Sequence, residues 1–327
     1  MAKGVKNKKQ HYVPQCYLRG FSDNGKGIFT YNKSLEKSFQ IGIKDACQID
    51  DFYKIHRKFI DEKEREQFEE NFYETTFFAK HIETEYNKQL IFIKQLLSEW
   101  INAPHDQPAL DSVTRDLLAG YLGIQLLRLP HIRNEYYQAH KKAEQKRLEI
   151  FKGFVTENNP KHKEFINTIS LNQDDDYASI VHSEIYSNQT LIDGMQDRLR
   201  EKTWAFLVSE TNDLYTSDFP LVVVPFIPRQ PPYYNGIGMR GVQIVIPITG
   251  SMAISMWDYD LFDHTKYRAE QFQPISRIDK MLFNLYQYAN AETNVFCAGN
   301  SFDFIDQVKR DGMLSSVYVY KSKTEVH

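Results

Sequence analysis

The feature that most constrains the fold is a change of sequence pattern at Thr203. Between Glu62 and Trp100, apolar residues recur every three or four positions, which is typical of the buried face of a helix. From Thr203 onward, short runs such as TWAFLVSE, GVQIVIPI and SMAISMW are rich in β-branched and aromatic residues and are separated by Asn, Pro and Gly. A chain that is helical first and β-rich afterwards is typical of α+β architecture rather than of alternating βαβ units.

We therefore predict an α+β fold with a small N-terminal β element, a helical middle region and an antiparallel C-terminal sheet with flanking helices. Strands are expected at 27–31 and 51–55, helices at 62–100, 111–130, 132–154, 177–200 and 278–291, and a strand at NVFCA before a last amphipathic segment. Residues 1–9 hold four lysines and no acidic residue, so we expect a flexible basic tail. Residues 10–327 are expected to form a single composite domain, helical from about 58 to 200 and β-rich from about 203 to 327.

Composition places the chain among ordinary globular proteins. Its 327 residues are 42% hydrophobic with a net charge of −3, which excludes a disordered chain and a strongly basic nucleic-acid coat protein. Cys16, Cys47 and Cys297 have no metal-type spacing, so free thiols and a cytoplasmic location are expected. Since no apolar run approaches the length of a membrane span, we expect no membrane partner. The sequence leaves the oligomeric state open.

The run QHYVPQCYLRGF at residues 10–21 combines polar groups with apolar anchors. His11 carries the side chain best suited to proton transfer near neutral pH, and histidine is the commonest metal ligand. Arg19 offers a planar fork for a carboxylate or a phosphate. Pro14 stiffens the segment between them, as a rigid site requires. The alternatives are a histidine bonded only to backbone and an arginine in an ordinary ion pair.

Three further polar residues stand out. Gln125 and Arg128 share one face of a helix that is otherwise rich in leucine and isoleucine. Each needs a partner, because an unbonded buried polar group costs about 1–3 kcal/mol. A buried structural network and a cavity for an anionic ligand both satisfy this need. In YTSDFP, Asp218 is placed either to bind a metal or act as a base, or to close an Asx turn.

These segments together resemble a mainly bacterial domain-of-unknown-function family, number 4238 in its series. The shared pattern is an H-x-V-P-x-x-Y-L-R-x-F opening, a Q-x-x-R-x-P helix end, a Trp before a T-S-D-x-P turn, and a late helical Asn followed by Ala. The matching residues are His11, Val13, Pro14, Tyr17, Leu18, Arg19, Phe21, Gln125, Arg128, Pro130, Trp204, Thr216, Ser217, Asp218, Pro220, Asn284 and Ala289. Cys16 stands where the family usually has an aromatic or small residue. The resemblance implies that the three distant segments converge on one site, and it implies no particular reaction.

Our first hypothesis is a hydrolase or nuclease that acts on a phosphate-containing substrate. His11 would be a general acid/base or metal ligand, and Asp218 would be a base or a metal-binding carboxylate. Arg19 and Arg128 would hold the anionic group. Gln125 and Asn284 would orient the substrate. A divalent metal ion is the one cofactor this residue set suggests, and nucleic acid is one partner it suits.

Two alternatives stay open. In the first, the same pocket binds an anionic small molecule without breaking a bond, as a sensing module does. The loop PFIPRQPPYYNGIGMRG at 225–241 would then be its lid or partner surface, and bacterial defence is a plausible setting. In the second, the polar residues form one buried network that holds the helical and β parts together, because such networks are as position-specific as active sites.

Overall fold

The structure is a computed structural model, and it describes residues 9–171, 174–225 and 236–316. Of the basic tail expected at 1–9, only Lys9 is among the described residues, and it begins the first strand. Most of the loop at 225–241 also lies outside them. The α+β class is confirmed. That residues 10–327 form one composite domain stays a prediction.

The N-terminal part contributes short strands. The strands are β1 (Lys9–His11), β2 (Gly27–Asn32), β3 (Lys37–Gly42) and β4 (Gln48–Asp50). Between β1 and β2 lie the short helix α1 (Gln15–Leu18) and a 3₁₀ turn (Arg19–Phe21). The strand expected at 27–31 is confirmed as β2, but the one at 51–55 is wrong. Asp51 adopts a left-handed φ of 52°, which turns the chain after β4. Phe52 and Tyr53 then pack as a pair of aromatic rings in a helical environment instead of on a sheet.

The helical middle region is confirmed with changed boundaries. Its elements are a π-helix (Tyr73–Ile82), α2 (Glu83–Asn102), α3 (Ser112–Leu127), α4 (Pro130–Asn158), α5 (Lys163–Thr168), α6 (Ala178–Ser187) and α7 (Gln189–Arg200). Asp111 caps α3 by accepting a hydrogen bond from the Thr114 N–H at 2.8 Å. The helix expected at 62–100 begins only at Tyr73. The one expected at 177–200 is two helices, because the side chain of Asn188 accepts from the Leu191 N–H and starts a new helix.

The C-terminal part builds two sheets. Its elements are β5 (Thr203–Val208), β6 (Thr216–Ser217), β7 (Val222–Pro225), β8 (Val242–Thr249), β9 (Met252–Trp257), β10 (Phe272–Pro274), α8 (Arg277–Asn290), β11 (Asn294–Cys297) and α9 (Asp303–Arg310). The larger sheet has the order β10-β5-β9-β8-β7, and it is mixed because β10 runs parallel to β5. The smaller sheet has the order β3-β2-β11-β6. The N-terminal strands β2 and β3 are therefore part of a sheet completed by the C-terminal half, whereas β1 and β4 pair with each other in a separate two-stranded sheet.

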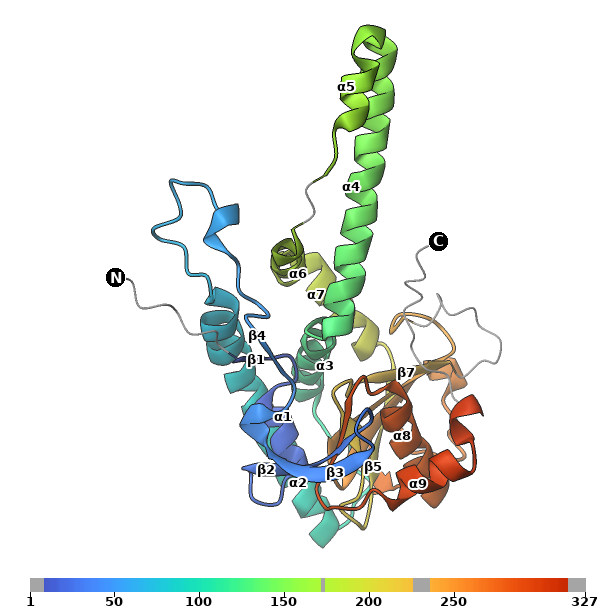
Figure 1. Ribbon diagram of the computed structural model, residues 1–327. Coiled ribbons are helices and arrows are strands. Elements are labelled where there is room, and N and C mark those ends of the chain that lie inside the picture. Colours follow the sequence, from blue (N-terminus) through green and yellow to red (C-terminus); the bar gives the residue numbers. More distant parts are fainter. Residues whose placement is uncertain (1–8, 172–173, 226–235, 317–327) are drawn as a thin grey trace.

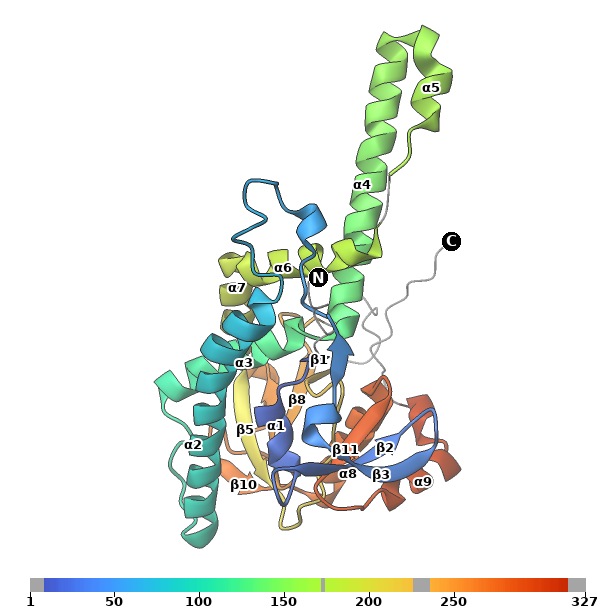
Figure 2. The same ribbon diagram turned by 60° about the vertical axis from the view of Figure 1, so that its left-hand side comes forward.

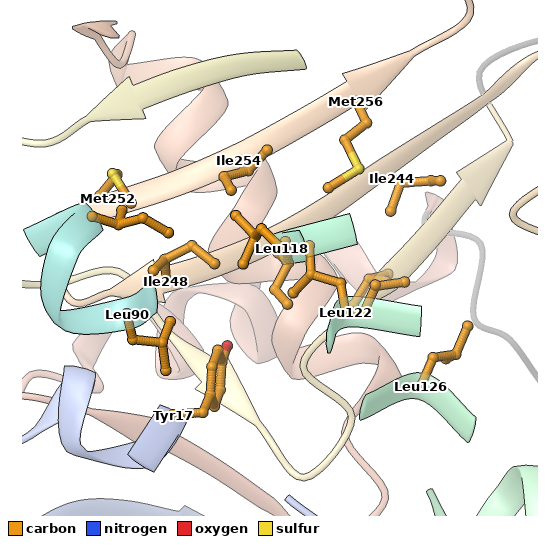
Figure 3. Packing of buried hydrophobic residues seen from close by; sticks show 14 of the residues in the cluster. Tyr17, Leu90, Leu118, Leu122, Leu126, Ile244, Ile248, Met252, Ile254 and Met256 are labelled. Carbon is orange, nitrogen blue, oxygen red and sulfur yellow. The ribbon is translucent and has the colours of Figure 1, made fainter. Parts of the chain in front are cut away.

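Helices cover both faces of the larger sheet, which explains why its central strands are buried at every position. On one face, side chains of β8 and β9 such as Ile246 and Ile254 pack against the leucines of α3 in the main core cluster. Figure 3 shows Leu118, Leu122 and Leu126 of α3 directed at this face, with Tyr17 of α1 and Leu90 of α2 beside them. The opposite face packs against Phe283 of α8.

One element leaves the body of the molecule. The 29 residues of α4 span about 44 Å at 1.5 Å per residue, and the helix projects well past the other helices in both views (Figures 1 and 2). The short α5 lies back against its far end. Within the described ranges, no helix has the length and apolar content needed to cross a bilayer.

Candidate functional site

Arg128 lies fully buried where α3 ends and α4 begins. Leu129 is extended because Pro130 follows it, so the chain turns there and the Arg128 side chain points back into the protein. Its Nε donates to the hydroxyl of Tyr53 at 3.1 Å, and its Nη2 donates to the backbone carbonyl of His11. The guanidinium lies 4.1 Å from the ring centre of Phe78. Arg128 is thus bonded to the opening segment through the backbone carbonyl of His11.

The counter-ion of Arg128 is Glu83, the first residue of α2. Its Oε1 lies 2.8 Å from Arg128 Nη1, and its side chain is one-quarter exposed. Burial lowers the pKa of Arg128, but Tyr53 and Glu83 outweigh burial, so the pKa lies above its ordinary value. The arginine therefore stays charged. Glu83 was not singled out from the sequence. Its spacing offered a signal, because Glu83 lies three residues before the buried Tyr86 and so shares the buried face of α2, where an acidic side chain requires a partner.

His11 sits beside this pair with its ring bonded elsewhere. Its Nε2 lies 3.1 Å from the carbonyl oxygen of Lys44. Because a carbonyl only accepts, Nε2 carries a proton. Burial lowers the pKa of the ring, so the neutral form is favoured. The backbone carbonyl of His11, in turn, also accepts from Tyr53 at 3.2 Å.

Gln125 lies on the same helix face as Arg128, as predicted, and is also buried. Its Oε1 accepts a hydrogen bond from the Tyr86 hydroxyl at 2.8 Å. Its Nε2 is enclosed and has no hydrogen-bond partner among the described residues. The tyrosine ring stacks on Tyr121 of α3. Gln125 therefore joins α2 to α3 from the inside.

Arg19 lines an open pocket of about 360 Å³ between α1 and α2. The residues around this pocket are Gln15, Cys16, Arg19, Ala79, Glu83, Thr84, Asn87 and Lys88. Glu83 thus forms part of the pocket wall while it pairs with Arg128 behind the wall. Burial raises the pKa of the Cys16 thiol to about 12, so this thiol is neutral and a poor nucleophile.

Asp218 and Asn284 belong to a different cluster. Both oxygens of the Asp218 carboxylate are bonded to the chain, since they accept from the N–H groups of Glu292, Thr293 and Asn294, each at 2.8 Å. Burial, its largest influence, nevertheless raises the pKa of Asp218 to about 6. Asn284 accepts from Tyr215 N at 2.8 Å and donates to a backbone carbonyl at 3.0 Å. These bonds tie α8, β6 and β11 together.

The motif segments nevertheless meet in space. The hydroxyl of Tyr17 lies 2.8 Å from Thr216 Oγ1 and donates to the carbonyl of Pro247 at 2.5 Å. The opening motif and the T-S-D-x-P turn are therefore in contact through Tyr17. Among the described residues, however, no hydrogen bond or ion pair joins Asp218 or Asn284 to His11, Arg19, Gln125 or Arg128. The catalytic pairing of His11 with Asp218 stays a prediction.

Metal binding has no candidate in the part of the chain that the structure describes, where no three side chains of the types His, Cys, Asp and Glu gather closely enough to hold an ion. All three cysteines are free and buried there. For the divalent metal of our first hypothesis, the described residues therefore add no ligand to His11 and Asp218, which stay predictions.

Comparison with known proteins identifies the family. A model of DUF4238, a family of proteins of unknown function, matches residues 9–300. No curated protein and no solved structure gives a significant match. The matched region includes every motif residue discussed above, from His11 to Ala289. The chain therefore belongs to DUF4238.

Proposed function

We propose that this protein binds an anionic ligand in the pocket between α1 and α2, without breaking a bond in it. One observation carries the proposal: Arg19 and Lys94 are neighbouring cations, and neither has a hydrogen-bond or ion-pair partner among the described residues. Burial is the largest cause that lowers the pKa of Lys94, and the positive charge of Arg19 lowers it further. A bound anion would remove this repulsion between like charges.

Helix geometry supports the same reading. Glu83, Asn87, Leu90 and Lys94 follow one another at steps of three or four residues, so they share the face of α2 that meets α1. Glu83 does not cancel the charge of Arg19, because Arg128 already neutralises it from behind. Arg19 therefore lines the pocket as a charged guanidinium with Lys94 near it, and such a pair of cations suits a phosphate or a carboxylate.

The size of the pocket favours a small molecule. Its volume of about 360 Å³ falls at the lower end of the range of about 300–1,000 Å³ usual for ligand pockets. Against hydrolysis, the Cys16 thiol is neutral and the Asp218 carboxylate accepts three backbone hydrogen bonds. We therefore favour binding over the phosphate hydrolase of our first hypothesis.

Calorimetric titration of the purified chain with inorganic phosphate, pyrophosphate and ribonucleotides tests the proposal. We expect at least one of these anions to bind, and we expect Arg19→Ala and Lys94→Ala each to weaken binding about tenfold, the loss typical of one charged contact. Lys142→Ala is the matched control, since Lys142 is an exposed cation on α4, away from the pocket.

Two results would refute the proposal. In the first, none of the anions binds to the folded wild-type protein, or the control variant loses as much affinity as Arg19→Ala and Lys94→Ala. In the second, the protein releases phosphate from a nucleotide at a rate that Arg19→Ala reduces. That second result would restore the hydrolase hypothesis.

A further inference from the structure

The arm formed by residues 146–168, the far part of α4 together with α5, stands apart from the rest of the molecule (Figures 1 and 2). Its two helices form a unit of their own, because Ile166 of α5 is buried and Lys152 of α4 donates to the carbonyl of Asn167 at 3.0 Å. The arm can therefore present a surface in a fixed shape to something outside the molecule.

Four large apolar side chains are exposed on this arm. They are Ile150, Phe151, Phe154 and Phe165, which are 64%, 53%, 67% and 70% exposed. Ile150 and Phe154 are one helical turn apart and Phe151 is adjacent, so three of them form a continuous patch. Single exposed apolar residues are ordinary, but a cluster of four at the end of a projecting element indicates a contact surface.

The charge of the arm is opposite to that of the chain. Residues 146–168 contain five Lys or Arg and three Glu, a net charge of +2, whereas the whole chain carries a net charge of −3. The basic residues surround the apolar ones, with Lys146 and Arg147 before the patch and Lys161 and Lys163 beyond it. All four lie at the surface.

We propose that the arm associates with the surface of an anionic lipid bilayer. Phenylalanine and isoleucine enter the boundary between headgroups and acyl chains, and the flanking lysines contact the anionic headgroups. Symmetric pairing of two arms fits less well, because it would bring two positively charged segments together. Surface association requires no spanning helix, so the proposal revises only our expectation of no membrane partner. It is independent of the anion site proposed above.

Flotation of the full-length protein with vesicles tests the proposal. The vesicles contain phosphatidylcholine alone, or equal parts of phosphatidylcholine and phosphatidylglycerol. We expect the wild type to float only with the anionic vesicles and to lose binding as salt is raised. The double variant Phe151→Asp/Phe154→Asp should bind at least tenfold more weakly, and Lys161→Glu/Lys163→Glu should bind at least tenfold more weakly at low salt.

The matched control is Ile278→Asp. Ile278 is 69% exposed on α8, in the body of the molecule, so this change removes an equally exposed apolar residue far from the arm. Circular dichroism shows whether each variant is folded, and we expect little change because the replaced side chains are exposed. The proposal is supported if the wild type and Ile278→Asp both bind the anionic vesicles and the arm variants do not.

Three outcomes overturn it. The wild type fails to float with anionic vesicles, the arm variants bind as well as the wild type, or the protein is a dimer that Phe151→Asp/Phe154→Asp dissociates while no vesicle binding is seen. The last outcome would assign the arm to self-association, which sedimentation velocity measures directly.

Discussion

The ion pair between Glu83 and Arg128 should be a main determinant of stability where α2, α3 and the N-terminal segment meet. Arg128 is 1% exposed at its side chain and lies 2.8 Å from Glu83, with further bonds to Tyr53 and His11. Removing one partner of a buried pair costs about 3–5 kcal/mol, because the other charge stays buried without a counter-ion. Glu83 is one-quarter exposed, so water reduces this cost. For Glu83→Gln, which keeps a hydrogen-bond acceptor, we expect a loss of about 2–3 kcal/mol.

Urea denaturation followed by circular dichroism measures this loss. The matched control is Glu85→Gln, two residues along the same helix. Glu85 pairs with Lys88 at 2.6 Å, but both side chains are about half exposed, so this change should cost less than about 1 kcal/mol. The two variants remove the same charge from the same helix end. Their difference therefore reports burial of the partner and not the net charge of α2.

A double-mutant cycle tests the cause. If the cost of Glu83→Gln arises from the buried Arg128, it should largely disappear when Arg128 is replaced by Met, since no buried charge then remains. The reasoning is refuted if Glu83→Gln costs no more than Glu85→Gln. It is equally refuted if Glu83→Gln costs the same with and without Arg128.

Three further predictions concern other parts of the fold. The pKa of Asp218 is raised from its ordinary value to about 6, so its stabilising contribution is fully present only below the unfolded pKa and is lost as pH rises through about 6. Relative to Asp218→Asn, the wild type should lose about 2 kcal/mol between pH 4 and pH 7 in a urea series. Gly20→Ala should lower the melting temperature, because the new Cβ would lie 2.4 Å from the backbone oxygen of Ile248. Gly153→Ala, on the exposed part of α4, meets nothing within 4 Å and should raise the free energy of unfolding by about 0.5–1 kcal/mol. Equal effects of the two substitutions would contradict this prediction. Tyr17→Phe removes the hydroxyl that bonds the opening motif to the T-S-D-x-P turn, and it should lower the free energy of unfolding by about 1–3 kcal/mol. Urea denaturation measures this loss, and an unchanged midpoint would show that the contact is dispensable.

Local pattern accounts for what could be predicted of the fold. The α+β class, the start of α3 at the Asp111 cap and the break before Pro130 follow from periodicity, capping and the restriction that proline places on its neighbour. The strand expected at 51–55, which the structure does not have, shows the limit of that approach. DFYKI has strand-like composition, yet its aromatic residues are taken up by a cluster with α6, which no local pattern reveals.

The candidate site shows the same division. Sequence indicated that Gln125 and Arg128 share a helix face and need partners, and both are buried and bonded. It did not indicate Glu83 as the counter-ion of Arg128 or Lys94 as the neighbour of Arg19, because these residues lie 45 and 75 positions away from their partners in the chain. A pairing over such a separation depends on how α1, α2 and α3 pack.

The sequence by itself therefore determined the fold class, most of the helices and strands, and the polar residues that required partners, since these depend on neighbouring residues and on the pattern of apolar positions. Only the tertiary structure decided which of those residues share a site. It joined β2 and β3 to β11 in one sheet, and it gave Asp218 and Arg128 different hydrogen-bond partners. It also showed that the apolar side chains at the far end of α4 are exposed to solvent. The physical reason is that long-range contacts are set by packing of whole elements, and the free energy of that packing is shared among many residues far apart in the chain.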